Sequence, residues 1–393
     1  MRTYVLVFVG VLTVGTGYAQ PAQTGVDTIT SGQAERAAHA TREGLNIEFS
    51  GFLRTRYRTI LNDSSGPDFI GANDGFSLDN ARFVADVAKE RFSARISIDG
   101  AVDRRDAANT AVGRVEVGLR DGWVAYRVHQ TFQLRFGQFK PDFDFEELQS
   151  TRDLLFIDRA VESRGVLGIE GFNTAGMSLP RQAGFQVFGR VPLAADFSLT
   201  YALSLTNGSG ANQPLNDNEQ LAPTARLALE QGNNLVLGGG FYLNRFSTGE
   251  PPDLITDEAM GWVVDFTYRR TLGAIGIVLN GQFMERYTTS VDVPNEPEVT
   301  ARGYHGALGI ELPRGFAVAY RYASFDPTQS FEAEDRVAEQ NLEADTVTHH
   351  TMGVNYTWDT VPAKCQLNYT LAMESDERTV DNDRIDALVQ LMF

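Results

Sequence analysis

Three arginines alternate along one short stretch of the chain, at Arg54, Arg56 and Arg58. In an extended strand, side chains two residues apart share a face and lie about 7 Å from one another. Guanidinium groups in such a row can bind anions through successive weak contacts. The same groups can equally pair with carboxylates, so the row predicts either anion contacts or ion pairs on the polar face of a strand.

Further arginines fall on the polar faces of other alternating segments, which predicts a larger anion-contacting set. Its members are Arg54, Arg56, Arg58, Arg82, Arg95, Arg135, Arg269 and Arg321. For any one of them, pairing with an inward carboxylate is an open alternative.

The elements that must hold these arginines show a period of two. In residues 197–206, Phe197, Leu199, Tyr201, Leu203 and Leu205 alternate with serine, threonine and alanine. Similar segments run from 45–59 to 383–393, joined alternately by very short turns and by longer, acidic loops rich in Gly, Pro and Asn. A set of soluble β-sandwiches would also bury one face of each strand, but it would not explain that alternation of turns and loops. The pattern therefore predicts an all-β fold, an antiparallel up-and-down transmembrane β-barrel of about 16 strands, with lipid outside and water inside.

The domain organisation follows from the two ends of the chain. Residues 1–19 have the features of a signal peptide, with predicted cleavage between Ala19 and Gln20. Residues 20–44 form a polar periplasmic lead-in, and residues 45–393 form the barrel in the outer membrane of a Gram-negative cell. A change of register near Asp121 predicts a β-bulge in the segment 113–128.

Composition and spacing narrow the possible chemistry. The chain has 393 residues and a net charge of -17, so it is a poor candidate for nucleic-acid binding. No histidine stands in a zinc-binding spacing, and no nucleophile elbow or phosphate-binding loop is present. We expect no catalytic residue, metal or cofactor, and we expect Cys365 to be a small apolar side chain on a lipid-facing strand.

Residues 141–180 show no clear alternation, although they are rich in aromatic and charged side chains. A connection of that length is usually functional, and a barrel of this size has a lumen that an inward-folded loop would narrow. We therefore expect a constriction loop. Its candidate residues are Lys140, Asp142, Asp144, Glu146, Glu147, Arg152 and Arg159.

The same region carries a family resemblance. The run LRFGQFKP (134–141) followed by FEELQSTRDLLFIDR (145–159) resembles the phosphate- and polyphosphate-selective porin family of Gram-negative outer membranes. Lys140 stands where the family motif has its lysine, but the chain has only two other lysines, Lys89 and Lys364. The resemblance implies a 16-stranded trimeric porin with an inward-folded third loop, and it makes phosphate or polyphosphate a possible solute.

These observations lead to one main functional hypothesis and two alternatives. The first is a water-filled channel for passive diffusion of small hydrophilic solutes, with a preference for anions, embedded in outer-membrane lipid and lipopolysaccharide as a homotrimer. The second is a structural or interaction barrel whose acidic surface loops, such as 326–345, bind partners. The third is an outer-membrane hydrolase. Measured current through single molecules separates the first from the second, and an esterase or phospholipase assay tests the third.

Overall fold

A computed structural model describes most of the chain outside its N-terminus and several loops. The described residues are 44–61, 75–105, 113–166, 174–194, 196–213, 215–216, 220–248, 255–292, 298–329, 346–374 and 382–393. The expected signal peptide and nearly all of the lead-in lie outside them, as do residues 330–345 of the acidic loop.

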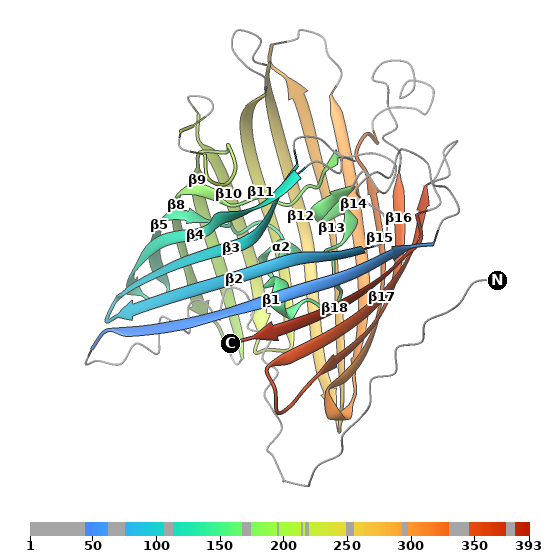
Figure 1. Cartoon of the computed structure of the whole chain (residues 1–393). Coiled ribbons are helices and arrows are strands. Elements are labelled where there is room, and N and C mark those ends of the chain that lie inside the picture. The colour runs from blue at the N-terminus through green and yellow to red at the C-terminus, as the bar shows by residue number, and fades with distance from the viewer. Residues whose placement is uncertain are drawn as a thin grey trace, which may run out of the picture.

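Among the described residues, sixteen strands close into one antiparallel barrel (Figure 1), in the order β1-β18-β17-β16-β15-β14-β13-β12-β11-β10-β9-β8-β5-β4-β3-β2. The predicted fold class and strand number are confirmed. The strands are β1 (Asn46–Ile60), β2 (Gly75–Lys89), β3 (Phe92–Arg105), β4 (Gly113–His129), β5 (Phe132–Phe139), β8 (Gln182–Pro192), β9 (Phe197–Thr206), β10 (Ala222–Gln231), β11 (Leu235–Thr248), β12 (Ile255–Leu272), β13 (Ile275–Ser290), β14 (Val299–Glu311), β15 (Phe316–Asp326), β16 (Val347–Thr357), β17 (Ala363–Glu374) and β18 (Arg384–Met392).

The two faces of the wall follow the alternation of the sequence. In β9, Leu203 and Leu205 are about half exposed on the outside, whereas Thr200, Ser204 and Thr206 are buried on the inside. Apolar side chains on an outer surface suit a hydrocarbon environment, and every backbone polar group of a closed barrel can pair with a neighbouring strand. The described residues contain no helix long and apolar enough to cross a membrane.

Closure joins the first and last strands. β1 pairs with β18 from Phe52 opposite Met392 to Ile60 opposite Arg384. The backbone of Phe393 also exchanges hydrogen bonds with Gly51, at 2.9 and 3.1 Å. The terminal strand thus completes the hydrogen bonding of the first, which leaves no open sheet edge.

Two local predictions are also confirmed. The register between β3 and β4 shifts where Ser97 faces Asp121 and Ile98 faces Leu119, so Arg120 is the extra residue of a bulge. Cys365 is half-buried in a shallow apolar groove on the outer wall, beside Tyr57 and Leu367.

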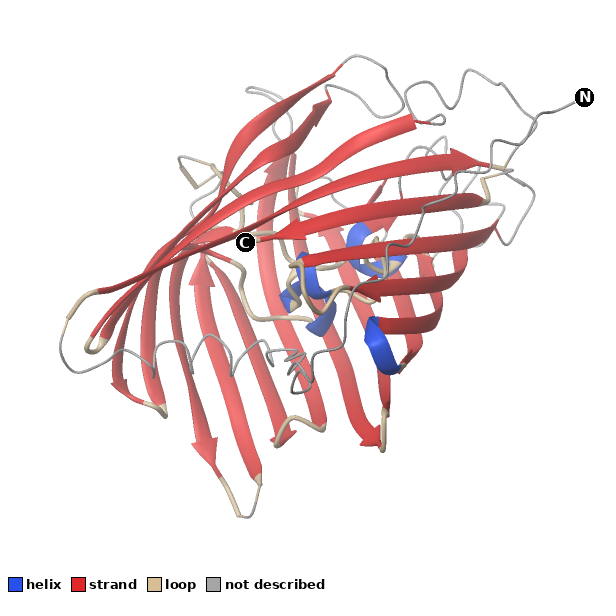
Figure 2. Ribbon diagram, turned by 60° about the horizontal axis from the view of Figure 1, so that its bottom comes forward, coloured by secondary structure: helices blue, strands red, loops and turns tan. Residues whose placement is uncertain are grey.

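The exception to the simple hairpin pattern is the connection between β5 and β8, residues 140–181, which we call the long connection. It contains α2 (Phe145–Leu148), the 3-10 turn η2 (Thr151–Asp153), α3 (Val161–Arg164) and a two-stranded sheet of β6 (Gly165–Val166) and β7 (Thr174–Ala175). Its short helices lie within the ring of strands in Figure 2. Its contacts, described next, are with both apolar and charged side chains of the inner face.

Candidate functional site

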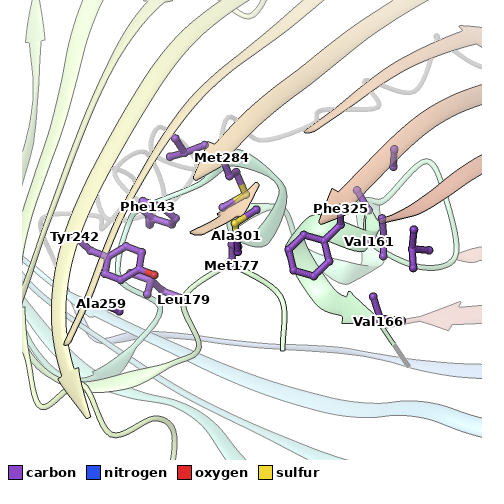
Figure 3. Close-up of a cluster of buried hydrophobic side chains, with 14 residues drawn as sticks. Phe143, Val161, Val166, Met177, Leu179, Tyr242, Ala259, Met284, Ala301 and Phe325 are labelled. Carbon is purple, nitrogen blue, oxygen red and sulfur yellow. The ribbon is translucent and has the colours of Figure 1, made fainter. Parts of the chain in front are cut away.

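The long connection is held against one side of the barrel by an apolar cluster (Figure 3). From the connection come Phe143, Ala160, Val161, Val166, Met177 and Leu179. From β11 to β16 come Tyr242, Ala259, Val263, Met284, Ala301, Ala323, Phe325 and Val347. These wall residues occupy inward positions that would otherwise face water, so they form a dry seat for the connection.

Glycines on the inner face let the connection approach closely. A Cβ added at Gly303 of β14 would collide with the Cβ of Glu162, and one added at Gly240 of β11 would collide with the carbonyl oxygen of Phe143. Side chains at these positions would hold the connection away from the wall. The surface that holds the long connection therefore combines small and apolar residues. In sequence, the strands that carry them look like ordinary barrel strands.

On the opposite side, the predicted arginine row of β1 also contacts the long connection. Arg54 is 2% exposed and donates to the carbonyl of Ile157 at 2.9 Å. Arg56 binds both oxygens of Asp158, at 2.6 and 2.9 Å, and Arg58 binds Asp158 at 3.0 Å. Arg56 also pairs with Asp79 of β2, and Arg58 with Asp386 of β18. In this structure Arg56 and Arg58 form ion pairs, whereas Arg54 binds Asn80 and a backbone carbonyl.

A cavity of about 180 Å³ lies between the long connection and the wall of β1 to β5. Its basic lining residues are Arg82, Arg95, Arg135, Lys140, Arg152 and Arg181, against the acids Asp121, Asp142 and Asp153. Among these lining side chains, positive groups outnumber negative ones by six to three.

Most of the lining charges are held in place by neighbours. Arg95 forms a two-point pair with Asp86, at 2.7 and 2.9 Å, and Arg82 donates to Asp99 at 2.8 Å. Arg181 pairs with Asp121 at 2.8 Å. Such pairs fix the guanidinium groups in space and reduce the net positive field that a solute would meet.

Arg135 has a different setting, because aromatic rings surround its guanidinium. The Cζ atom lies 4.6 Å from the ring centre of Phe188, 4.8 Å from Trp123 and 5.6 Å from Phe139. Cation–π contact with several rings holds the group in one orientation while it keeps its charge. Trp123 therefore belongs to the site, although the sequence analysis did not include it.

The remaining candidates of the long connection form a network near its start. Lys140 and Arg159 both pair with Glu147, at 2.5 and 2.6 Å. Asp144 caps α2 by accepting a hydrogen bond from the Glu147 amide at 2.7 Å. Asp142 accepts from Gln186 of β8 at 3.2 Å, and Arg152 contacts its neighbour Asp153.

Burial and these pairs shift three pKa values in the long connection. Burial lowers the pKa of the Lys140 ammonium to about 7, although Glu147 opposes the shift. Burial raises the pKa of Asp144 to about 7, against the hydrogen bond from the Glu147 amide. For Glu147, burial is outweighed by the charges of Arg159 and Lys140, which bring its pKa to about 2. Lys140 is thus the lining cation whose charge changes near neutral pH.

The structure places the other predicted residues away from this cavity. Arg321 of β15 donates to Glu146 and to the carbonyls of Asp158 and Arg159, at 3.1 to 3.2 Å. Arg269 lies 3.9 Å from Glu311. The sequence analysis missed Arg181, which directly follows the predicted end of the loop at residue 180. A boundary drawn at the first strongly alternating residue, Gln182, would have included it.

Comparison with known proteins agrees with this architecture. A model of the family phosphate-selective porin O and P matches residues 53–266. None of the curated protein sequences compared matches this chain. Among solved structures, the anion-selective porin from Comamonas acidovorans is similar, with a TM-score of 0.58 at 11% identity over 89% of this chain and 100% of that one.

Two further solved structures share the fold. The outer membrane channel DcaP of Acinetobacter baumannii has a TM-score of 0.54 at 13% identity, over 90% of this chain and 99% of that chain. Salmonella typhi OmpF, in complex with daunomycin, has a TM-score of 0.58 at 10% identity, over 88% and 97%. Likeness at such low identity shows the fold, and the family match covers more than half of the sequence. The chain therefore belongs to the phosphate-selective porin O and P family and forms an outer-membrane channel.

Proposed function

We propose that this channel passes small hydrophilic solutes by passive diffusion and prefers anions. The observation that carries the proposal is the cavity between the long connection and β1 to β5, with six basic lining side chains against three acidic ones. Fixed cations along a narrow aqueous path raise the local concentration of anions and lower that of cations. The long connection, seated on β11 to β16, is the element that narrows this path.

The solute class is broader in this proposal than inorganic phosphate. Most lining cations are guanidinium groups, and Lys140 is the one lysine among them. Arginine binds phosphate and carboxylate oxygens in a two-point geometry. We therefore expect chloride, carboxylates and phosphate all to pass, with no strong exclusion of one in favour of another.

The assembly and surroundings complete the proposal. We propose a homotrimer in outer-membrane lipid and lipopolysaccharide, exported through the N-terminal signal peptide. One solved structure with this fold, OmpT of Vibrio cholerae, is described as a trimer form. We also propose that the barrel is not a hydrolase, which an esterase and phospholipase assay on the folded protein tests directly.

The decisive experiment is a reversal-potential measurement across a planar bilayer with a KCl gradient, repeated with potassium phosphate. A porin gives discrete open steps and a reversal potential of the sign that marks anion preference. Arg135→Gln removes a lining charge fixed by aromatic rings and should reduce that preference. Arg127→Gln, at the exposed periplasmic end of the neighbouring strand β4, is the matched control. An absence of current would favour the structural or interaction barrel, and a cation preference would contradict the proposed selectivity.

A further inference from the structure

A second charged cluster lies outside the cavity, where the two short helices α2 and α3 of the long connection meet β14. Glu146 of α2 and Glu162 of α3 converge on the imidazole of His305. The His305 Nδ1 atom lies 2.5 Å from Glu162 Oε1 and 3.2 Å from Glu146 Oε2. All three residues are at most 6% exposed, and their ligand atoms lie within 4.8 Å of one another.

The cluster has more acceptor oxygens than donors. Glu162 Oε2 and Glu146 Oε2 are buried and have no hydrogen-bond partner among the residues that the structure describes. The Nδ1 atom of His305 can donate its single proton to one oxygen at a time. Each buried acceptor left without a donor costs about 1 to 3 kcal/mol, so the oxygens favour a further positive partner.

A fourth polar group comes from outside this trio. Gln282 of β13 is 4% exposed, and its Nε2 lies 3.2 Å from Glu162 Oε1. Its Oε1 also lacks a hydrogen-bond partner among the described residues. Rotating the Gln282 amide by half a turn exchanges its Nε2 and Oε1 atoms and brings Oε1 toward the Glu162 carboxylate. The site can therefore present two carboxylates, one imidazole nitrogen and one amide oxygen.

We propose that Glu146, Glu162 and His305 bind a divalent transition-metal ion of the zinc type, with Gln282 as a further ligand. Mixed imidazole and carboxylate ligands suit zinc, which takes four of them at about 2.0 to 2.2 Å. Ligand atoms around such an ion lie roughly 3.3 Å apart. The two atom pairs at 2.5 and 3.2 Å therefore need only small outward shifts to surround the ion.

The charges near the cluster set the limits of the site. Arg321 reaches the other oxygen of Glu146, Oε1, at 3.2 Å, and its second nitrogen is bound to the carbonyls of Asp158 and Arg159. The Arg321 charge offsets one of the two carboxylate charges. The second carboxylate charge needs a further cation to balance it. That cation is either the metal or a proton on His305, and the two exclude each other at Nδ1.

The position of the site gives the ion a structural role. Residues 146 and 162 lie on either side of the segment that reaches Arg54, Arg56 and Arg58, and His305 belongs to the barrel wall. An ion bound to all three would fasten the long connection to β14 at two points. It would stabilise the folded barrel without lining the anion cavity, so this inference stands independently of ion selectivity.

The test uses the full folded barrel in detergent at neutral pH, with Zn²⁺ and Co²⁺ as probes. We expect one tightly bound ion per chain after dialysis, a rise in Tm with Zn²⁺, and a Co²⁺ absorption spectrum typical of low coordination number. X-ray absorption of the unmodified Zn²⁺ protein should show one imidazole nitrogen among oxygen ligands. Glu162→Gln and His305→Gln should each weaken binding at least tenfold. Glu285→Gln, a carboxylate 6% exposed on β13 and paired with Arg302, is the control and should bind as the unmodified protein does.

Two results would overturn the assignment. One is the absence of saturable binding to the unmodified barrel, in which case a protonated His305 holds the cluster. The other is an X-ray absorption spectrum without imidazole, or equal binding by the His305 and Glu285 variants, which would locate the ion elsewhere. The spectrum of the unmodified protein decides the question even if a variant fails to fold.

Discussion

The inner faces of the two sides of the barrel differ in chemistry. On β11 to β16, the inward side chains that meet the long connection include Val263, Met284 and Phe325, all buried in an apolar cluster. On β2 to β5, the inward side chains include Arg82, Arg95 and Arg135, which line a cavity. The β11 to β16 side holds the long connection in place. The β2 to β5 side borders the cavity that remains between the long connection and the wall. Under the proposed function, anchoring and conduction therefore depend on different residues.

The largest expected effect comes from a change in the apolar cluster on β11 to β16. Phe325→Ala should lower the free energy of unfolding by about 3 kcal/mol, because removing a fully buried aromatic ring leaves a cavity that the rigid wall cannot fill. Denaturant unfolding in detergent measures the loss, and single-channel recordings should show added current noise as the connection loosens.

The matched control for Phe325→Ala is Phe316→Ala, which removes the same ring from the outward face at the other end of β15. Phe316 is 48% exposed, and its ring lies against that of Tyr356 at a tilt of 45°. Phe316→Ala should lower the free energy of unfolding by less than Phe325→Ala does, and it should add no current noise. Equal noise in both variants would show that the apolar cluster does not hold the connection.

An intermediate effect is expected where the connection meets β1. Asp158→Asn removes the carboxylate shared by Arg56 and Arg58, which leaves the two arginines with Asp79 and Asp386 as partners. One added positive charge about 10 Å from the path is worth about 0.4 kcal/mol in water, or roughly a twofold change in ion concentration. Because the anion concentration rises and the cation concentration falls by that factor, the anion-to-cation permeability ratio should rise about fourfold in a reversal-potential measurement.

Asp196→Asn provides the control for Asp158→Asn, because it makes the same charge change at an exposed residue between β8 and β9. The permeability ratio should stay the same in this variant. If Asp158→Asn left the ratio unchanged as well, Arg56 and Arg58 would be too remote from the path to act on solutes.

How far the sequence could predict this molecule differs between the two sides. The wall is predictable because lipid and water impose a period of two, so β1 and β18 begin and end within one residue of the predicted segments. The seat was not predicted, because Phe325 and Val347 are apolar residues at inward positions and their partners come from the aperiodic long connection. Only the tertiary structure shows that these side chains pack against protein.

The site was predicted in part for a related reason. Residue type and alternation identified Arg82, Arg95 and Arg135 as inward cations, and the predicted constriction loop included Lys140 and Arg152. The structure places all five around one cavity. The pairing of the Arg54 row with Asp158 could not be derived, because it depends on the path of a loop without periodicity. The meeting of His305 with Glu146 and Glu162 could not be derived either, because it depends on the same loop.

The smallest expected effect is a pH dependence of the anion preference, caused by two groups at the start of the long connection. The pKa of Lys140 is about 7 because the ammonium is buried. Its positive charge is present below that pH and is lost above it. The Asp144 carboxyl, whose pKa is also about 7, gains a negative charge over the same interval. Both changes act in one direction, so anion preference should fall between pH 6 and pH 8.

Reversal potentials measured with Lys140→Met separate the two groups. This variant should have the lower anion preference at pH 6 and should nearly match the unmodified channel at pH 8. It should therefore lose most of the pH step, and any step that persists belongs to Asp144. Lys89→Met, at an exposed turn, should keep the full step. Because Glu147 has a pKa of about 2, it stays ionised throughout and cannot produce the change. A step of unchanged size in the Lys140 variant would mean that the lysine charge does not reach the solute path, and selectivity would then depend on the arginines alone.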